Sequence, residues 1–192
     1  MKWIKSKALF SLSLLLPLGS CNYNDARVDY DKQIKVCSTA ESNGLIDMAA
    51  QACHQALKIA DDQVFAPAEV SELLYRLGYL ERQRGQFKDA ERLIRRSLAI
   101  EDLLNNQEKI ASRLIELALN QAGQDLWLDG AETLKHVVPL LESLSDNDRK
   151  AAAGAFRLFS VRLEMRGYKA EAKLFKADFP DRENISGLAI IN

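Results

Sequence analysis

The side chains best suited to covalent chemistry or metal binding in this sequence belong to three cysteines and two histidines, Cys21, Cys37, Cys53, His54 and His136. His54 directly follows Cys53, so on a helix its side chain points about 100° away from the cysteine and the two are poorly placed to share a metal ion. The sequence contains no His-Glu-x-x-His motif, no nucleophile elbow and no phosphate-cradling glycine loop. We therefore expect no catalytic residue, no metal and no cofactor.

Cys21 stands at the end of a segment with the layout of a secretory signal. Three lysines precede an apolar stretch over residues 8–16, which is too short to span a bilayer. The cleavage region Leu18-Gly19-Ser20-Cys21 resembles the lipobox of bacterial lipoproteins, although Gly19 stands where Ala or Ser is more usual. The alternative is a plain secreted protein with an incidental cysteine, but ordinary signal cleavage prefers a small residue where Leu18 stands.

The lipoprotein resemblance implies that residues 1–20 are a signal peptide and that Cys21 is the lipidated first residue of the mature protein. Two or more acyl chains, such as palmitate, hold a protein stably on a membrane. Because Asn22 follows the cysteine in place of Asp, the resemblance favours the outer membrane, with the protein facing the periplasm.

Cys37 and Cys53 are predicted to lie opposite each other on two antiparallel helices. A helical hairpin that turns near residues 42–45 brings positions equidistant from the turn side by side, and the two cysteines are equidistant from it. The compartment beyond the inner membrane is oxidising, so we expect a disulfide. Two buried thiols are the alternative.

Composition favours an all-helical domain that binds no nucleic acid. Leu, Ala, Glu, Arg, Lys and Gln, which are good helix formers, dominate the chain, whereas Gly (9) and Pro (4) are scarce. The formal net charge is −1, and there is no run of basic residues that would indicate a nucleic-acid partner. No alternating pattern of a strand is evident.

An internal repeat of about 41 residues is the main signal of the fold. Alanines recur in register at Ala49, Ala90, Ala131 and Ala172. In three of the four copies a glycine stands five residues earlier, at Gly44, Gly85 and Gly167. The third copy has Leu126 in that place.

The copy over residues 71–104 resembles the tetratricopeptide repeat (TPR) in its Leu74-x-x-Leu77-Gly78 segment, followed by Gly85 and Ala90. The resemblance implies a right-handed all-α solenoid of about four antiparallel helix pairs, in which Gly78 permits close packing and Gly85 turns the chain. Two residues depart from the family pattern: Glu81 replaces an aromatic residue and Ser97 replaces an alanine. A generic helical bundle is the alternative.

We expect one helical domain over residues 27–180, after a short lipidated tether over 21–26 and before a flexible tail over 181–192. The expected helix pairs are 27–39 with 44–60, 67–84 with 86–103, 107–123 with 127–143, and 147–166 with 168–178. Pro139 lies inside the sixth helix, so we expect a kink or an early end there.

In TPR proteins the first helices of the pairs line a concave groove that binds peptides or partner helices. The resemblance places these partner-binding candidates in the groove: Glu72, Tyr75, Tyr79, Arg82, Arg113, Glu116, Asn120 and Arg157, followed by Val161. Tyr75 and Tyr79 share a helix face, and aromatic rings beside arginine suit recognition. We expect truncations there to leave folding intact, because the groove does not lie between helices. Ordinary solvated faces are the alternative.

Together these patterns predict a non-enzymatic, membrane-anchored protein–protein interaction adaptor of the bacterial cell envelope, whose partner is another envelope protein. The alternative is an accessory or regulatory subunit of an envelope enzyme, or a glycan-binding structural protein. The two histidines, together with Arg95, are expected to form an exposed basic column without a catalytic role.

Overall fold

The computed structural model describes residues 20–178, with the surroundings of side chains described for residues 24–176. Within this range the chain forms helices and no strand. The elements are α1 (Ser20–Ser42), α2 (Ile46–Asp62), α3 (Pro67–Gln83), α4 (Phe87–Leu104), α5 (Gln107–Gly123), α6 (Trp127–Lys135), the 3-10 helix η1 (Val138–Ser143), α7 (Asp146–Met165) and α8 (Lys169–Asp178). The predicted signal up to residue 19, the side chain of Cys21 and the predicted tail lie outside the described residues.

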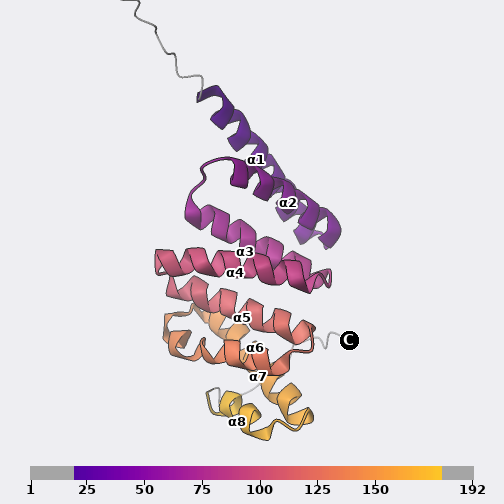
Figure 1. Ribbon diagram of the computed structural model, residues 1–192, viewed down its shortest axis with the longest axis vertical. Helices are drawn as coiled ribbons and strands as arrows, with labels where there is room; N and C mark the ends of the chain where they lie inside the picture. The colour runs from indigo at the N-terminus through magenta and orange to yellow at the C-terminus, as the bar shows by residue number, and fades with distance from the viewer. Residues whose placement is uncertain (1–19, 179–192) are drawn as a thin grey trace, which may run out of the picture.

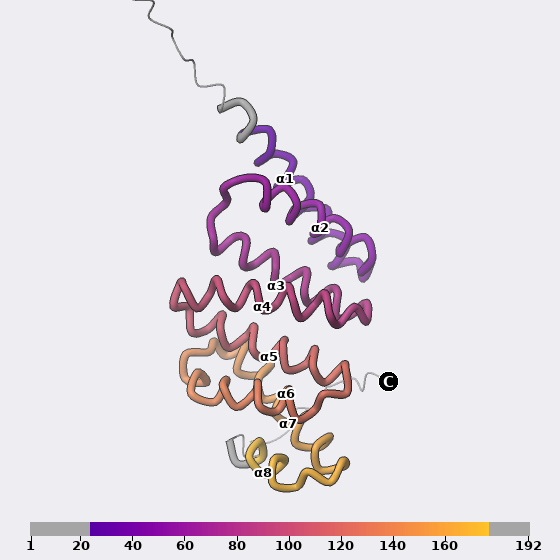
Figure 2. The backbone as a smooth tube through the Cα atoms, viewed as in Figure 1, coloured from indigo at the N-terminus to yellow at the C-terminus, as the bar shows by residue number. Residues whose placement is uncertain are grey.

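The helices form four successive antiparallel pairs that stack along the long axis of the molecule, from α1 at one end to α8 at the other (Figure 1). The backbone tube follows the same layered path (Figure 2). The predicted all-α solenoid is confirmed. None of the described helices combines the length and apolarity that a membrane span requires.

Two helices differ in length from the prediction. α1 begins at Ser20 rather than at residue 27, so the residues expected to form a tether belong to the first helix. α6 ends at Lys135, and the chain continues through η1, which contains Pro139 near its start. The early end before Pro139 is the predicted one, because proline cannot donate the helical hydrogen bond of its position.

The same type of turn connects the two helices of each of the four pairs. In each turn a backbone N–H donates to the carbonyl five residues back, a bond of the Schellman type that ends helices. These bonds join Leu45 to Ala40, Gln86 to Glu81, Leu126 to Gln121 and Tyr168 to Leu163, each at 2.9 Å. The left-handed residue of the turn is Gly44, Gly85 or Gly167 in three pairs, with φ of 72°, 74° and 88°.

In the third pair the left-handed residue is Asp125, with φ of 63°. The prediction that Leu126 stands in place of the glycine is therefore wrong by one residue. It follows that the equivalent of Ala90 is Gly130 rather than Ala131. At the start of α4 the N–H of Ala90 donates to the carbonyl of Gln86, and at the start of α6 the N–H of Gly130 donates to the carbonyl of Leu126 in the same way. The third copy of the repeat is thus shifted by one position relative to the strict 41-residue spacing.

Small residues allow the paired helices to pack closely. A Cβ on Gly78 would lie 2.7 Å from Cγ1 of Ile94, which confirms the close approach of α3 and α4 that the glycine predicts. A Cβ on Gly130 would lie 2.7 Å from ring atoms of Phe159 and 2.9 Å from the carbonyl oxygen of Ala118. A larger residue at either position would push neighbouring helices apart.

The core consists of two large apolar clusters. One is formed by residues of α1 to α4, between Tyr30 and Leu93, and the other by residues of α5 to α8, between Ala111 and Phe175. A small cluster of Ala90, Ile94 and Leu117 lies between them. Buried polar side chains fill much of the remaining space at the α3–α4–α5 junction, including Ser71, Ser97 and Glu101.

Candidate partner-binding face

The shared turn defines which positions of the first helices are equivalent. Counting back two residues from the carbonyl that accepts the turn bond gives Ser38 on α1, Tyr79 on α3, Leu119 on α5 and Val161 on α7. All four are at least partly exposed, and Val161 is 48% exposed. We call the surface that carries these four positions the first-helix face.

On α3 the predicted residues belong to this face but are partly covered. The Glu72 side chain is 52% exposed, whereas Tyr75 and Tyr79 are half-buried. The guanidinium of Arg113 lies 4.0 Å from the centre of the Tyr75 ring, and that of Arg82 lies 5.5 Å from the centre of the Tyr79 ring. Burial raises the pKa of Tyr75 to about 12, with a further contribution from the charge of Glu116. Each ring thus has a guanidinium beside it, and the partly exposed Tyr79 ring also packs against the core.

On α5 the predicted residues do not lie on the face. Arg113, Glu116 and Asn120 are 3%, 4% and 0% exposed, so the expectation that they line an open groove is wrong. The cause is the one-residue shift of the third repeat, because one residue rotates a side chain by about 100° around a helix. The positions of α5 in register with the α3 column are Ser112, Ile115, Leu119 and Ala122, and all but Ile115 are partly exposed.

Three ion pairs join α3 to α5, and one of them is between Lys109 and Glu72, 3.4 Å apart. Arg82 Nε donates to Glu116 Oε1 at 2.5 Å, and Arg113 Nη2 donates to Glu72 Oε2 at 2.8 Å. The Arg82 side chain is 23% exposed and that of Glu116 is 5% exposed. In place of the expectation that truncating Arg82 leaves folding intact, we now expect it to destabilise the fold, because its loss would leave a buried carboxylate without its cation.

Similar polar contacts join α1 to α3. Arg76 Nη1 donates to Ser38 Oγ at 2.7 Å, and its Nε lies 3.4 Å from a carboxylate oxygen of Glu41. Arg27 and Glu69 form a further pair at 3.0 Å. Neighbouring first helices from α1 to α5 are thus fixed to each other by side chains on or next to the face.

On α7 the predicted column is accessible. Arg157 and Val161 are both exposed, as expected for this helix, where the turn glycine Gly167 keeps the predicted register. Val161 follows Tyr79 and Leu119 at the same repeat position. The face therefore carries a partly exposed apolar stripe, Tyr79–Leu119–Val161, that crosses three successive first helices.

A buried polar cluster explains why Ser97 departs from the family pattern. Ser97 Oγ lies 2.9 Å from Ser71 Oγ and 3.1 Å from Arg113 Nε, which donates to it. Ser71 Oγ in turn donates to Glu101 Oε1 at 2.5 Å. An alanine in place of Ser97 could accept no bond from the guanidinium, so the serine belongs to the same arrangement as the buried Arg113.

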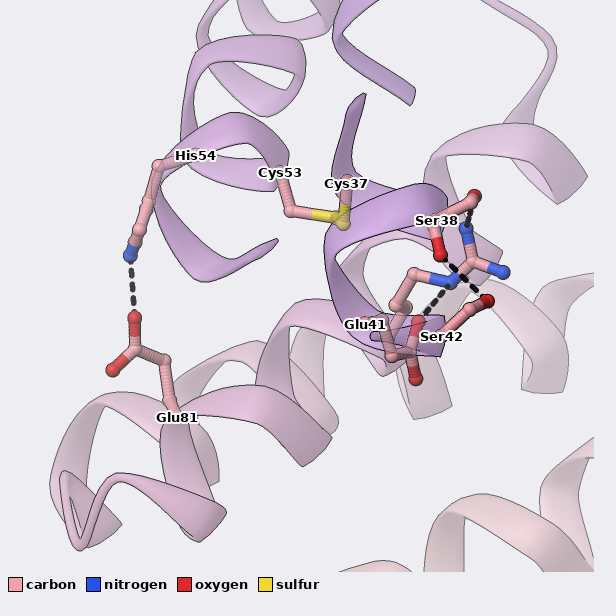
Figure 3. Close-up of a disulfide and its surroundings, with 8 residues drawn as sticks. Cys37, Ser38, Glu41, Ser42, Cys53, His54 and Glu81 are labelled. Atoms are coloured by element: carbon pink, nitrogen blue, oxygen red, sulfur yellow. Dashed lines mark hydrogen bonds and ion pairs between the residues drawn. A yellow bond between two sulfur atoms is a disulfide. The ribbon is translucent and has the colours of Figure 1, made fainter. Parts of the chain in front are cut away.

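Glu81, the second departure, is also explained by its partners. Its carboxylate is 3% exposed and accepts two bonds from Arg84 Nη1, at 3.0 and 2.9 Å. His54 Nε2 lies 2.7 Å from Glu81 Oε1 and joins α2 to α3 (Figure 3). His54, Arg95 and His136 are all exposed. The one-residue shift of the third repeat, however, places Lys135 rather than His136 in register with Arg95, so the predicted column is wrong at its third member.

The disulfide joins the two helices of the first pair. Cys37 on α1 and Cys53 on α2, the pair that the sequence predicts, are bonded and fully buried, with Cα atoms 5.4 Å apart (Figure 3). Cross-links of this kind stabilise a fold chiefly by restricting the unfolded chain. No group of three or more metal-binding side chains occurs among the residues that the structure describes.

No protein-family model matches the sequence, and no curated protein matches it. Among solved structures, a kinesin light chain from Podosopora anserina with nearly identical TPR-like repeats aligns with a TM-score of 0.61 and 16% identity, over 78% of this chain and 72% of that one. A single-residue variant of the same kinesin light chain aligns equally well, with a TM-score of 0.61 over 77% and 71% of the two chains. A structure of MamA protein aligns with a TM-score of 0.45 and 13% identity. The similarity to the kinesin light chain structures shows that the chain has a TPR-like fold.

Proposed function

We propose that this protein is a non-catalytic adaptor of the bacterial cell envelope, anchored in a membrane by lipid at Cys21, that binds a peptide or helix of another envelope protein on its first-helix face. The observation that carries the binding proposal is the apolar stripe Tyr79–Leu119–Val161. The anchoring proposal is supported by the lipobox-like Leu18-Gly19-Ser20-Cys21 segment.

The chemistry of the stripe favours a partner with regularly spaced apolar side chains. Equivalent residues of successive repeats are separated by about one helix-to-helix distance, roughly 10 Å. An extended peptide spans this distance in about three residues and an α-helix in about seven. A partner segment with apolar residues at one of these spacings could therefore contact Tyr79, Leu119 and Val161 together.

The fixed first helices suit such a role. Ion pairs between α1 and α3 and between α3 and α5 hold the side chains of the face in place before a partner arrives. Binding then orders few side chains, which lowers the entropic cost of association. Arg82 serves this purpose by holding Glu116 and by lying over the Tyr79 ring.

Site-specific photocrosslinking in cells tests the binding proposal. A photoreactive amino acid replaces Tyr79, Leu119 or Val161 in turn, and Arg95, exposed on the second helix α4, provides the control position. We expect the three face positions to yield an adduct with the same protein, identified by mass spectrometry, and Arg95 to yield none of it. Equal adduct from Arg95, or unrelated adducts from the three face positions, would contradict the proposal.

A separate experiment tests the anchor, so that the two parts of the proposal can fail independently. Cys21→Ser removes the only thiol that the lipobox offers for acylation. We expect the variant to leave the membrane fraction and to lose incorporation of labelled palmitate. If it remains in the membrane fraction with its label unchanged, the anchoring proposal is wrong.

A further inference from the structure

A hollow of about 300 Å³ opens between the α5–α6 turn and the α7–α8 turn. It is lined by residues 125–129 on one side and by Arg166 and Tyr168 on the other. These turns lie at the ends of the first helices, so the hollow is separate from the stripe Tyr79–Leu119–Val161. Its volume is at the lower end of the range for sites that take a small ligand or a few side chains.

The wall of the hollow is a fixed arrangement around Trp127. The indole packs against the Phe159 ring, with ring centres 5.2 Å apart, and the guanidinium of Arg166 lies 4.9 Å from the centre of the indole. The indole Nε1–H donates to Asp125 at 2.8 Å, and Arg166 also donates to Asp125. These bonds, with Arg166 the larger cause, lower the pKa of Asp125.

Asp125 occupies a backbone position that favours glycine. Its φ is 63°, and the other three turns have Gly44, Gly85 and Gly167 in its place. Left-handed conformations cost a residue with a Cβ more than they cost glycine, although Asp is among the better tolerated. The carboxylate, which holds both Trp127 and Arg166, is the feature that glycine could not supply. Asp125 therefore fixes the wall of the hollow at some expense in backbone energy.

The rim of the hollow is apolar and exposed. Leu126, Leu128 and Tyr168 are 44%, 43% and 40% exposed. The equivalents of the two leucines in the preceding α3–α4 turn are Gln86 and Lys88, which are polar. In the α1–α2 turn the equivalent of Leu126 is Leu45, which is 50% exposed, but the equivalent of Leu128 is Asp47. Relative to the first two pairs, the pair of exposed leucines is therefore particular to the α5–α6 turn.

The charge of the hollow is unbalanced. Arg166 is neutralised by Asp125, whereas Asp129 has no ion pair or hydrogen bond from its side chain to the residues described. Asp129 also lies in the first turn of α6, where an acidic residue complements the helix dipole, as Asp89 does in α4. One carboxylate therefore remains at the apolar rim without a cationic partner.

We propose that this hollow binds a short peptide segment of another protein in which a basic side chain is flanked by apolar ones. The apolar side chains contact Leu126, Leu128 and Tyr168, and the basic side chain pairs with Asp129. Aromatic and aliphatic walls with one opposite charge are the features that recognise such a segment. The proposal requires neither a membrane anchor nor a partner on the first-helix face.

The indole N–H of Trp127 reports directly on occupancy. The measurement uses the full chain with the substitution Trp3→Phe, which leaves Trp127 as the only tryptophan and gives one indole N–H signal in NMR spectra. The probes are acetyl-Leu-Arg-Leu-amide and its acidic counterpart acetyl-Leu-Glu-Leu-amide. We expect a saturable shift of the signal with the basic peptide and none with the acidic one.

Two matched variants separate the pocket from the helix dipole. Asp129→Asn should lower the affinity for the basic peptide about fivefold, the loss expected for one exposed ion pair. Asp89→Asn removes the corresponding first-turn acid of α4 and should leave the affinity unchanged. Leu128→Ser, which keeps the charge, should also weaken binding. The proposal is overturned if the two peptides shift the signal equally or if neither gives a saturable shift. It is also overturned if Asp129→Asn binds the basic peptide as tightly as the protein with Asp129 does. If the indole N–H signal shifts with protein concentration in the absence of peptide, the hollow is instead occupied by another copy of this chain, and the proposal is overturned.

Discussion

Helices α3 and α5 are first helices of successive repeats, yet they present their residues differently. On α3 the residues expected on the partner-binding face, such as Glu72 and Tyr79, are at least partly exposed. On α5 the residues 41 positions later, among them Arg113 and Asn120, are buried. The difference arises at the turn after α5, where Asp125 takes the left-handed position one residue earlier than the strict spacing predicts. The geometry of the turn is thus the same in every repeat, whereas the number of residues between turns is not.

The comparison is tested most strongly by neighbouring residues of α5. Arg113→Ala removes a buried guanidinium that contacts Glu72, Ser97 and the Tyr75 ring, and it leaves the buried Glu101 with less compensation. We expect a loss of about 3 kcal/mol in the free energy of unfolding, measured by urea denaturation. Ser112→Ala, one residue away on the face, removes only a partly exposed hydroxyl that bonds to Arg113 Nη1 and the Lys109 carbonyl, so it should change the free energy of unfolding by no more than about 1 kcal/mol. Similar losses from both variants would contradict the assignment of Arg113 to the buried side of α5 and of Ser112 to its exposed side.

The packing of the second pair provides the next test. Ala90 is fully buried between helices, whereas Ala99 on the same helix is exposed. Ala90→Leu should therefore lower the stability by about 1–3 kcal/mol through overpacking, and Ala99→Leu should have little effect. Melting temperatures by circular dichroism are sufficient to compare them. Equal melting temperatures would argue against the repeat register on α4.

Gly130 tests the shifted register of the third pair. Replacing a glycine inside a helix by alanine usually stabilises it by about 1 kcal/mol. A Cβ on Gly130 would meet the Phe159 ring and the Ala118 carbonyl, so we expect Gly130→Ala to destabilise the protein by about 1 kcal/mol instead. Gly154→Ala on α7 is the control, because its Cβ meets nothing within 4 Å and should stabilise. Stabilisation by both changes would show that α6 does not pack as described.

The smallest effect concerns alkaline stability and the Tyr75 ring of α3. Its pKa is raised to about 12, so the folded state favours the neutral phenol. That contribution is complete below the ordinary pKa of about 10 and is lost as the pH rises towards 12. Tyr75→Phe has no phenol to ionise, so its free energy of unfolding should fall less between about pH 10 and pH 12 than that of the natural protein. Parallel losses in the two proteins would contradict the burial of Tyr75.

Much of the fold could be predicted from local chemistry. Gly44, Gly85 and Gly167 mark left-handed turns because no other residue adopts that backbone so freely, and they predict three of the four helix pairs. Cys37 and Cys53 are paired by the geometry of a hairpin around Gly44. Pro139 ends α6 for a reason that depends on proline alone.

The candidate face could be predicted only in part, because it depends on a register that the sequence marks weakly at one turn. Asp125 adopts the conformation of glycine, which Asp tolerates better than Leu does, but the strict 41-residue spacing points to Leu126 and only the turn bonds decide between the two residues. Arg113 and Glu81 are buried and have partners on other helices, Ser97 and His54, so their burial is set by tertiary packing rather than by helical periodicity. Polar residues in a repeat are easily assigned to solvent for this reason.

The most direct test of the central claim is the affinity of the partner found by crosslinking for variants of the first-helix face. Tyr79→Ala should weaken binding about 30-fold, the loss typical of an aromatic anchor, and Val161→Asp should weaken it as well. Both should keep a folded protein with a cooperative melting transition, and Arg95→Ala, on the opposite side, should bind normally. If folded Tyr79→Ala and Val161→Asp bind the partner with unchanged affinity, the protein does not act through the face that its first helices form.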